Sequence, residues 1–269
     1  MRNLIASITL CAGSLLFAGT SPSGRPPYES ANVVGFSIVT LRPGYNLLAL
    51  NFDRIGSPAG SDLNSLIPGT TAHLTAGNAE TADQVLVFSG GAYTTYFLYY
   101  SSNVLTRFNY KWVSAGPALC TNKFKSGDAF FYNKRGAVPV AIAFGGQVPE
   151  DASKTHAIAP GYNMIGSVYS IAWDPNALGA ACWATNGAVH GSTADTADQI
   201  QTFSPDGKYT TYFLWYSTTT ATAFNNQWVS LPGPTKAPAN FVKVGAGVWY
   251  NHRGSGFTLP QTIPCALIR

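Results

Sequence analysis

Hydrophobic and polar positions along this chain alternate over short stretches that end at glycine- and proline-rich turns. Such stretches predict β-strands, and β-branched and aromatic residues dominate them. Residues 84–88 and 92–100 flank Ser89-Gly90-Gly91, a pattern typical of a hairpin. The strands expected before residue 149 cover residues 33–41, 45–51, 84–88, 92–100, 109–114, 128–133 and 138–144.

Helical periodicity is not sustained anywhere after the N-terminal region. The best helix candidate covers residues 61–66, about two turns, with Ser61 as its N-cap. Many short strands with glycine and proline between them favour an all-β fold, a β-sandwich or barrel-like architecture.

Five sequence blocks occur twice, in the same order. Each block returns 115 to 118 residues later. We therefore expect two tandem homologous units of about seven short strands each, over residues 31–148 and 149–266, joined near residues 147–151. The blocks are Pro43-Gly44-Tyr45-Asn46 and Pro160-Gly161-Tyr162-Asn163, Thr81-Ala82-Asp83-Gln84 and Thr196-Ala197-Asp198-Gln199, Tyr93-Thr94-Thr95-Tyr96-Phe97-Leu98 and Tyr209-Thr210-Thr211-Tyr212-Phe213-Leu214, Trp112-Val113-Ser114 and Trp228-Val229-Ser230, and Tyr132-Asn133-Lys134-Arg135-Gly136 and Tyr250-Asn251-His252-Arg253-Gly254.

These blocks resemble a β module of secreted bacterial proteins. That module begins with Pro-Gly-Trp-Asn-Leu-Ile and ends with Gly-x-Gly-Tyr-Trp-Val. Here the start is Pro43-Gly44-Tyr45-Asn46-Leu47-Leu48, with Tyr in place of Trp, and the second glycine of the end motif is kept only as Gly247. The resemblance implies an all-β fold and a secreted protein. It implies no general activity and no catalytic residues.

The N-terminus has the three-part layout of a secretory signal peptide. Arg2 is followed by an apolar stretch over residues 4–17 and then by small and polar residues. We expect a signal peptide over residues 1–20, cleaved between residues 18 and 24, and a secreted, extracellular or cell-surface protein. The alternative is a buried N-terminal helix. The apolar stretch is too short for a permanent membrane anchor, and the residues before Cys11 do not form a lipoprotein cleavage site.

Composition narrows the class of protein further. Only 10% of the 269 residues are charged and 13% are aromatic, which excludes a disordered solvating chain and a coiled coil. A net charge of +4 without basic clusters gives no support for a nucleic-acid partner.

Three cysteines remain once the leader is removed: Cys120, Cys182 and Cys265. An oxidising compartment allows one disulfide among them, with three pairings open. The remaining thiol would be buried and inert, or would link two chains. Their wide spacing does not predict a zinc site.

Catalytic motifs are not recognisable, and we expect no cofactor, no metal and no enzymatic activity. Asp83 and Asp198 occupy equivalent positions before a strand, where capping of a turn is the simpler reading than catalysis. The nearest metal-like grouping is His190 with Asp195 and Asp198, whose spacing matches no metal motif.

The duplicated aromatic strand is the best candidate for a contact surface. Both of its faces are apolar or aromatic, so it is either covered on both sides or exposed for contact. Because a strand end lies nearer the surface than its middle, we predict ligand or subunit contacts at Tyr99, Tyr100, Trp215 and Tyr216.

These features favour a secreted, non-enzymatic β-repeat protein with a structural, self-assembling or adhesive role, whose partner is a further copy of the chain or a cell-surface glycan. The alternative is a carbohydrate-binding module that uses an exposed aromatic face. A second alternative is an extracellular hydrolase, which requires acidic or His side chains that converge in one cleft.

Overall fold

The computed structural model describes residues 33–55, 59–116, 118–149, 151, 153–178 and 180–262. Within these residues the fold is all-β: five antiparallel sheets hold nearly all of the regular structure. None of these sheets closes into a barrel across the described residues. The expected signal peptide, residues 1–20, lies outside the described residues, as does Cys265.

The described residues of the first half form nine strands in three sheets. β2-β8-β4-β5-β6 form a five-stranded sheet, β1 pairs with β9, and β3 pairs with β7. The seven expected strands are confirmed to within three residues at each end. The strands are β1 (Val34–Leu41), β2 (Gly44–Ala49), β3 (Ser61–Asp62), β4 (Gln84–Ser89), β5 (Ala92–Tyr99), β6 (Lys111–Ser114), β7 (Lys123–Phe124), β8 (Ala129–Lys134) and β9 (Val140–Gln147).

The second half has the same strand order in its large sheet. β11-β16-β12-β13-β14 match β2-β8-β4-β5-β6, with β15 added at the edge, and β10 pairs with β17 as β1 pairs with β9. The strands are β10 (Ser153–Ile158), β11 (Gly161–Gly166), β12 (Gln199–Phe203), β13 (Tyr209–Trp215), β14 (Gln227–Ser230), β15 (Thr235–Lys236), β16 (Gly247–His252) and β17 (Phe257–Thr262).

The expected helix is shorter than predicted. Helix α1 (Leu63–Leu66) has a single turn, and its N-cap is Asp62, whose side chain accepts a hydrogen bond from the Ser65 backbone N–H. Ser61 belongs instead to β3, because its backbone pairs with Phe124. The second half has α2 (Ala180–Thr185) at the corresponding place, after the short 3-10 helix η2 (Pro175–Leu178).

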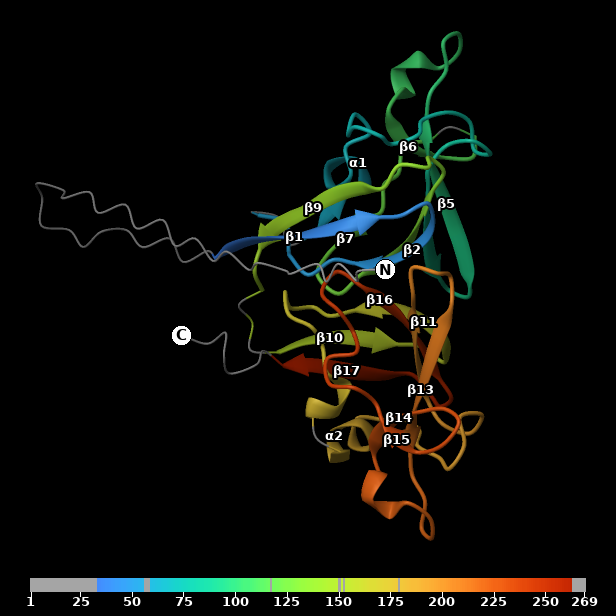
Figure 1. The fold of residues 1–269 in the computed structure, drawn as a ribbon. Coiled ribbons are helices and arrows are strands. Elements are labelled where there is room, and N and C mark those ends of the chain that lie inside the picture. The colour runs from blue at the N-terminus through green and yellow to red at the C-terminus, as the bar shows by residue number, and fades with distance from the viewer. Residues whose placement is uncertain are drawn as a thin grey trace, which may run out of the picture.

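Each half is a small sandwich in which a two-stranded ribbon covers one face of the large sheet. In the first half, Leu41, Val140 and Phe144 of the β1–β9 ribbon join one core with Val85 and Phe130 of the large sheet. The second half repeats this with Ile158 and Leu259 of the β10–β17 ribbon. Trp112 and Trp228 are completely buried in the two cores. Figure 1 shows the halves one above the other, with β1 and β9 in the upper half and β10 and β17 in the lower.

The halves meet in a seam whose contacts come in reciprocal pairs. The backbone N–H of Ala49 donates to the Gly245 carbonyl, and the N–H of Gly166 donates to the Gly127 carbonyl, both at 2.9 Å. In the repeated blocks Ala49 corresponds to Gly166, and Gly127 to Gly245. Exchanging the halves therefore exchanges the two bonds, which is the signature of an approximate twofold axis.

The seam is also very close. A Cβ atom added at Gly166 would overlap the Cβ of Ala49, so this position accepts no side chain. Asn51 joins the halves as well: its side-chain amide donates to the Ser167 carbonyl and its Oδ1 accepts from the Gly245 N–H (2.7 Å). Lys154 pairs with Asp53 across the same boundary. Such backbone-level contact fixes the orientation of the two halves.

Candidate functional site

Four tyrosines on the seam form the most prominent aromatic surface of the described residues. Tyr45 and Tyr162 are the second residues of β2 and β11, Tyr93 is the second residue of β5, and Tyr209 is the first residue of β13. Their exposed fractions are almost equal, between 47% and 49%. Their rings all contact one cluster of aromatic residues contributed by both halves, so the four lie on one surface. We call these four residues the tyrosine plate.

Buried aromatic rings from both halves support the plate. Phe88 of β4 packs edge-on against Trp249 of the other half, with ring centroids 4.8 Å apart. The reciprocal pair is Phe203 of β12 against Phe131, at 5.5 Å. The turn of each hairpin, β4–β5 and β12–β13, thus reaches over the opposite half (Figure 1). Leu47 completes a cluster in which Phe131 and Trp249 are buried.

Each plate tyrosine rests on this support with its ring edge-on or tilted. Tyr45 contacts Phe131 and Tyr162 contacts Trp249, at 5.9 and 5.7 Å between ring centroids and interplanar angles of 82° and 81°. Tyr93 contacts both Phe88 and Trp249. Edge-to-face packing of this kind favours one ring orientation, so the plate is supported in that orientation before any partner arrives.

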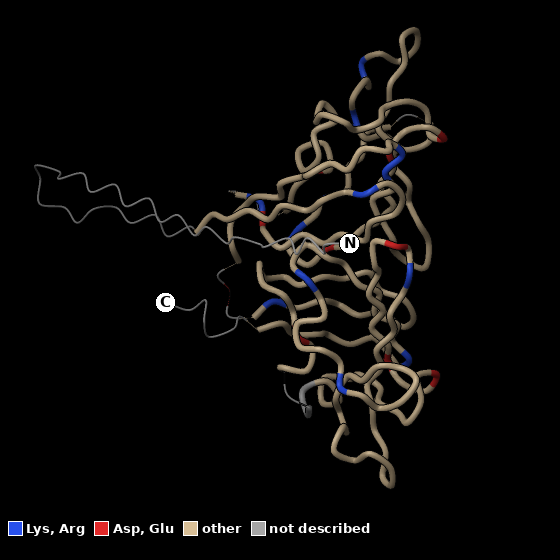
Figure 2. The backbone as a smooth tube through the Cα atoms, viewed as in Figure 1, with Lys and Arg blue, Asp and Glu red and all other residues tan. Residues whose placement is uncertain are grey.

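The plate is polar at its phenol groups but carries no charged side chain of its own. Burial, followed by the proximity of Tyr209 and Tyr45, raises the pKa of Tyr93, which indicates that the three phenol groups lie near one another. An exposed Asp206–Lys208 ion pair lies beside the plate in the β12–β13 turn. Figure 2 shows how sparse the charged residues are over the described part of the chain. The surface suits an uncharged partner with apolar area and hydroxyl or amide groups.

The contact residues expected from sequence divide into two groups. Tyr99 and Trp215 are buried, at 8% and 6% exposure, so the expectation that a strand end brings them to the surface is wrong. Tyr99 packs with Phe97 and Val113 on the second face of its sheet and donates a hydrogen bond to the Val104 carbonyl. The reason is that loops cover this end of the strand on both faces. Its exposed end is the opposite one, at Tyr93.

Tyr100 and Tyr216 are exposed, at 44% and 37%. They directly follow the last residues of β5 and β13, at the opposite strand ends from the plate residues Tyr93 and Tyr209. Tyr100 packs beside Tyr110, and Tyr216 stacks on His190 with ring centroids 4.2 Å apart. They lie next to the loops that carry the 3-10 helices η1 (Thr106–Phe108) and η3 (Thr222–Phe224), at the two ends of the molecule (Figure 1). Their predicted contact role remains a prediction.

Asp83 and Asp198 are buried structural centres. The carboxylate of Asp83 accepts hydrogen bonds from the Thr75 N–H, the Tyr132 hydroxyl and the Arg135 N–H, at 2.7–3.1 Å. Lys134 lies 3.8 Å away, with both side chains completely buried. Asp83 therefore connects two of the repeated sequence blocks by hydrogen bonds.

Asp198 repeats this arrangement with histidine in place of lysine. It accepts from the Val189 N–H, the Tyr250 hydroxyl and the Arg253 N–H, and Nδ1 of His252 lies 2.9 Å from Oδ2. Nε2 of His252 faces the Ser255 carbonyl at 2.6 Å. This is an acid and a histidine within hydrogen-bond reach, as a hydrolase requires. Both side chains are nevertheless 0% exposed and fully occupied by the protein itself, so a substrate has no access to them.

His190 and Asp198 do not meet at a common point. Nδ1 of His190 lies 2.6 Å from the Asn226 side-chain oxygen, while Asp198 faces His252. Within the part of the chain that the structure describes, no three His, Cys, Asp or Glu side chains are grouped to hold a metal ion.

Cys120 is a buried free thiol, and burial raises its pKa. A raised pKa keeps the thiol protonated and unreactive. Because Cys120 is free in the structure, neither of the two pairings that involve it is present there. Cys182 lies in α2 with its side chain outside the description, and Cys265 is beyond it.

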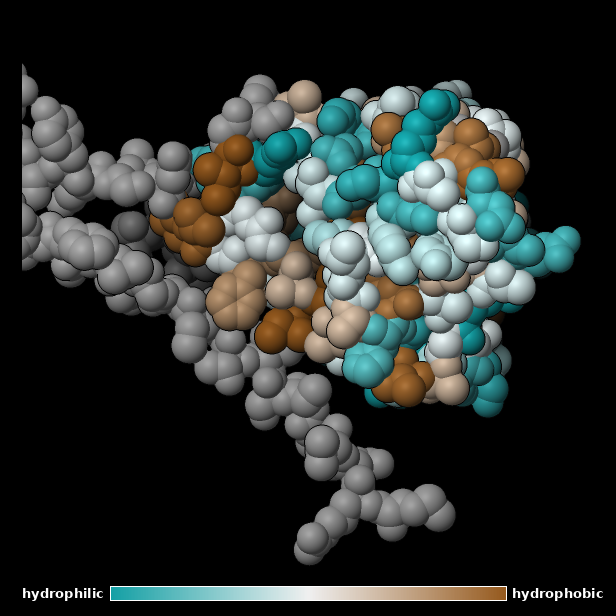
Figure 3. Space-filling model, turned by 90° about the horizontal axis from the view of Figure 1, so that it is seen from above, coloured by the Kyte–Doolittle hydropathy of each residue, from teal (hydrophilic) through white to brown (hydrophobic). Residues whose placement is uncertain are grey.

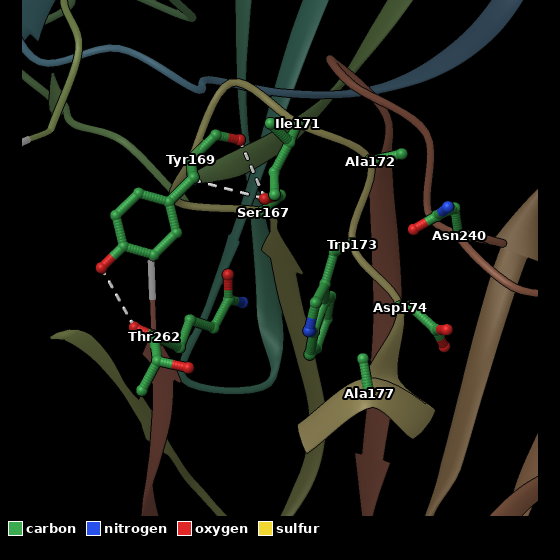
Figure 4. A pocket seen from close by; sticks show the side chains of 10 residues that line it. Ser167, Tyr169, Ile171, Ala172, Trp173, Asp174, Ala177, Asn240 and Thr262 are labelled. Carbon is green, nitrogen blue, oxygen red and sulfur yellow. Dashed lines mark hydrogen bonds between the residues drawn. The ribbon is translucent and has the colours of Figure 1, made fainter. Parts of the chain in front are cut away.

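The second half also contains a cavity of about 380 Å³, shown in Figure 4. The rings of Trp173 and Tyr169 line it together with Asp174, Asn240 and Thr262. Its polar groups are mostly engaged within the chain: the Tyr169 hydroxyl donates to the Asp151 carbonyl, and Asp174 accepts from the Asn176 N–H. The buried indole N–H of Trp173 has no hydrogen-bond partner among the described residues and could donate to a ligand there. We rank the cavity below the plate because the plate is built by both halves, whereas the cavity is lined by the second half alone.

Sequence reasoning did not identify the plate, although a signal was present. Tyr45 and Tyr162 stand in the same repeated block, and so do Tyr93 and Tyr209. A tyrosine kept at two duplicated positions could have been examined as a surface feature. Only the twofold packing of the halves shows that the four residues share one surface.

No helix among the described residues is long and apolar enough to cross a membrane. Comparisons with protein-family models, with curated proteins and with solved structures found no match to this chain, so the resemblance to a secreted bacterial β module remains a prediction.

Proposed function

We propose that this chain is a secreted, non-enzymatic β protein with a structural or adhesive role outside the cell, and that the tyrosine plate is the surface that holds its partner. The observation that carries the proposal is the plate itself: four half-exposed tyrosines on a rigid seam built from both halves. Exposed aromatic surface has no role in the core, and tyrosine is enriched at contact surfaces.

The non-enzymatic part of the proposal is supported by the position of the acid–histidine pair. Asp198 and His252 are buried beneath the surface, and the first half uses Lys134 at the same place for the same structural purpose. The extracellular part is supported by the N-terminal sequence pattern alone.

The test compares two sets of tyrosine variants in the same binding assay. Tyr45, Tyr93, Tyr162 and Tyr209 are changed together to Ser in one chain, and Tyr100 and Tyr216 are changed to Ser in a control chain. Purified protein is applied to immobilised cell-envelope material and is inspected by negative-stain electron microscopy. The proposal expects binding or assembly by the wild type and the control, and its loss in the plate variant. Equal behaviour of the wild type and the plate variant would refute it.

A second candidate function is carbohydrate binding through the same plate. The observation that favours it is the combination of ring edges with closely spaced phenol groups and no charge, which suits the apolar and hydroxyl faces of a neutral sugar. A glycan array separates the two candidates. Binding to neutral glycans that disappears in the plate variant supports carbohydrate recognition, and an array without binding counts against it.

A further inference from the structure

The outer face of the β1–β9 ribbon is an exposed apolar surface in an otherwise ordinary sandwich. Val34, Phe36 and Ile38 point outward from β1, with 55%, 53% and 62% of each residue exposed. The inward positions of the same ribbon, such as Leu41 and Phe144, are buried in the core. Figure 3 shows hydrophobic residues on the side of the molecule where the described chain meets the grey trace, as well as a separate group on the opposite side.

The fold does not require large apolar residues on this face, because the second half has small polar residues where β1 has Phe36 and Ile38. In the repeated alignment Phe36 corresponds to Ser153 and Ile38 to Thr155. On the partner strand, Ala141 corresponds to Thr258. Ser153, Thr155 and Thr258 are all exposed. The chain therefore contains its own reference surface, and the apolar residues of the first half need another explanation.

On the apolar face, large side chains lie on one strand of the ribbon and small side chains on the other. The register places Phe36 opposite Gly145 and Ile38 opposite Ala143, and paired residues in an antiparallel ribbon point to the same side. Large side chains thus form a ridge along β1, and small residues form a trough along β9. Gly145 and Ala143 are both exposed, so the trough is open.

A ridge beside a parallel trough is complementary to itself after a half-turn. If a second copy of the chain is laid face to face, its β1 ridge enters the β9 trough of the first copy, and the reverse contact forms at the same time. No charged residue lies at the outward positions from Val34 to Thr40 or from Ala141 to Gly145. Two like copies therefore meet without charge repulsion, and a charged partner would gain nothing.

The size of the face is compatible with a weak dimer. Three large apolar residues, each about half exposed, together with Val33 and the trough residues, offer on the order of 500 Å² per copy. Two copies would bury on the order of 1,000 Å², near the lower limit for a specific protein interface. We propose that two copies of this chain pair through the outer face of the β1–β9 ribbon. This deepens the structural side of the proposed function but uses a different surface from the plate.

The test measures self-association by sedimentation velocity over a wide range of protein concentration. The full chain and a chain without residues 1–20 are each prepared as wild type and as the double variant Phe36→Ser/Ile38→Thr. These substitutions copy Ser153 and Thr155, which the second half already carries in the same ribbon. The proposal expects a concentration-dependent dimer of the chain without residues 1–20, weakened at least about 30-fold in the double variant.

A reverse variant strengthens the test. Ser153→Phe/Thr155→Ile/Pro260→Ala/Thr262→Gly gives the second half the same ridge and the same trough of small residues opposite it, so each molecule would carry two self-complementary faces and should form chains longer than a dimer. Circular dichroism confirms that each variant is folded.

Several outcomes overturn the proposal. A wild type that stays monomeric at every concentration in both preparations overturns it, and so does a dimer that the double variant leaves intact. A dimer that instead dissociates in the four-tyrosine plate variant assigns self-association to the plate. Loss of partner binding in the plate variant with an unchanged dimer separates the two surfaces, so either proposal can fail without the other.

Discussion

The twofold packing predicts a measurable coupling, in the free energy of unfolding, between aromatic rings that meet across the seam. Trp249 is only 7% exposed and packs edge-on against Phe88 of the other half at 4.8 Å. Truncation of a buried Trp to Ala costs about 3–5 kcal/mol, and an edge-to-face aromatic pair adds about 0.5–1.5 kcal/mol beyond the area that it buries. Phe88 is only partly buried, so Phe88→Ala costs less.

The prediction is tested with a double-mutant cycle. Phe88→Ala, Trp249→Ala and the double variant are unfolded in urea and followed by circular dichroism, since fluorescence would change with the loss of Trp249 itself. We expect the double variant to be more stable than the sum of the single losses predicts, by about 0.5–1.5 kcal/mol. The reciprocal pair, Phe131 and Phe203, should show coupling of the same sign.

The control cycle joins Trp249→Ala with Phe124→Ala. Phe124 lies in the core of the first half and belongs to a different cluster from Trp249. Distant sites add within about 0.3–0.5 kcal/mol, so this cycle should show no coupling beyond that. If Phe88 and Trp249 are as additive as the control pair, the seam is not packed as described, and the support beneath the plate is refuted.

Three further predictions concern the seam and the buried carboxylates. Gly166→Val should destabilise the chain by more than about 3 kcal/mol in thermal or urea unfolding, because its Cβ overlaps Ala49, whereas Gly233→Ala, which has open space, should change stability by less than about 0.5 kcal/mol. Burial lowers the pKa of His156 from 6.5 to about 4. Between these values the unfolded chain binds a proton that the native chain does not, so stability should fall by at most about 3 kcal/mol as the pH drops from 7 to 4, and His156→Gln should flatten that part of a pH–stability curve. His252→Leu removes a partner of buried Asp198 and should cost about 3–5 kcal/mol in urea unfolding, while His252→Lys, which copies Lys134, should cost clearly less; equal losses would contradict the structural role given to this position.

The strands could be predicted from the sequence, but the residues that they expose at the surface could not. Alternation and turn residues locate β4 and β5 well, because Ser89-Gly90-Gly91 marks the hairpin turn. Burial along β5, however, changes with position and not with face: Tyr93 is exposed, and Tyr96 to Tyr99 are buried on both faces. Alternation reports only which side a residue points to, so it cannot show that one end of a strand protrudes over the seam while the other is covered by loops.

The hydrogen-bond partners of the buried carboxylates could not be predicted from the sequence, for a different reason. Asp83 was recognisable as a structural residue, but its partners, Tyr132 and Arg135, come from a block about fifty residues away. A single sequence gives no information on which repeated blocks meet. In the same way, Tyr45 and Tyr209 share the plate only because the two halves are related by a twofold axis, which neither unit contains by itself.

Chemical footprinting of the tyrosines tests the central claim most directly. The free protein is nitrated, the modified tyrosines are identified by mass spectrometry, and the reaction is repeated on protein bound to cell-envelope material. All exposed tyrosines should react in the free protein, including Tyr100, Tyr110 and Tyr216, which lie away from the plate and serve as internal references. We expect binding to protect Tyr45, Tyr93, Tyr162 and Tyr209 and to leave the reference tyrosines reactive. Protection of Tyr100 and Tyr216 with an unprotected plate would contradict the account and move the contact surface to the ends of the molecule.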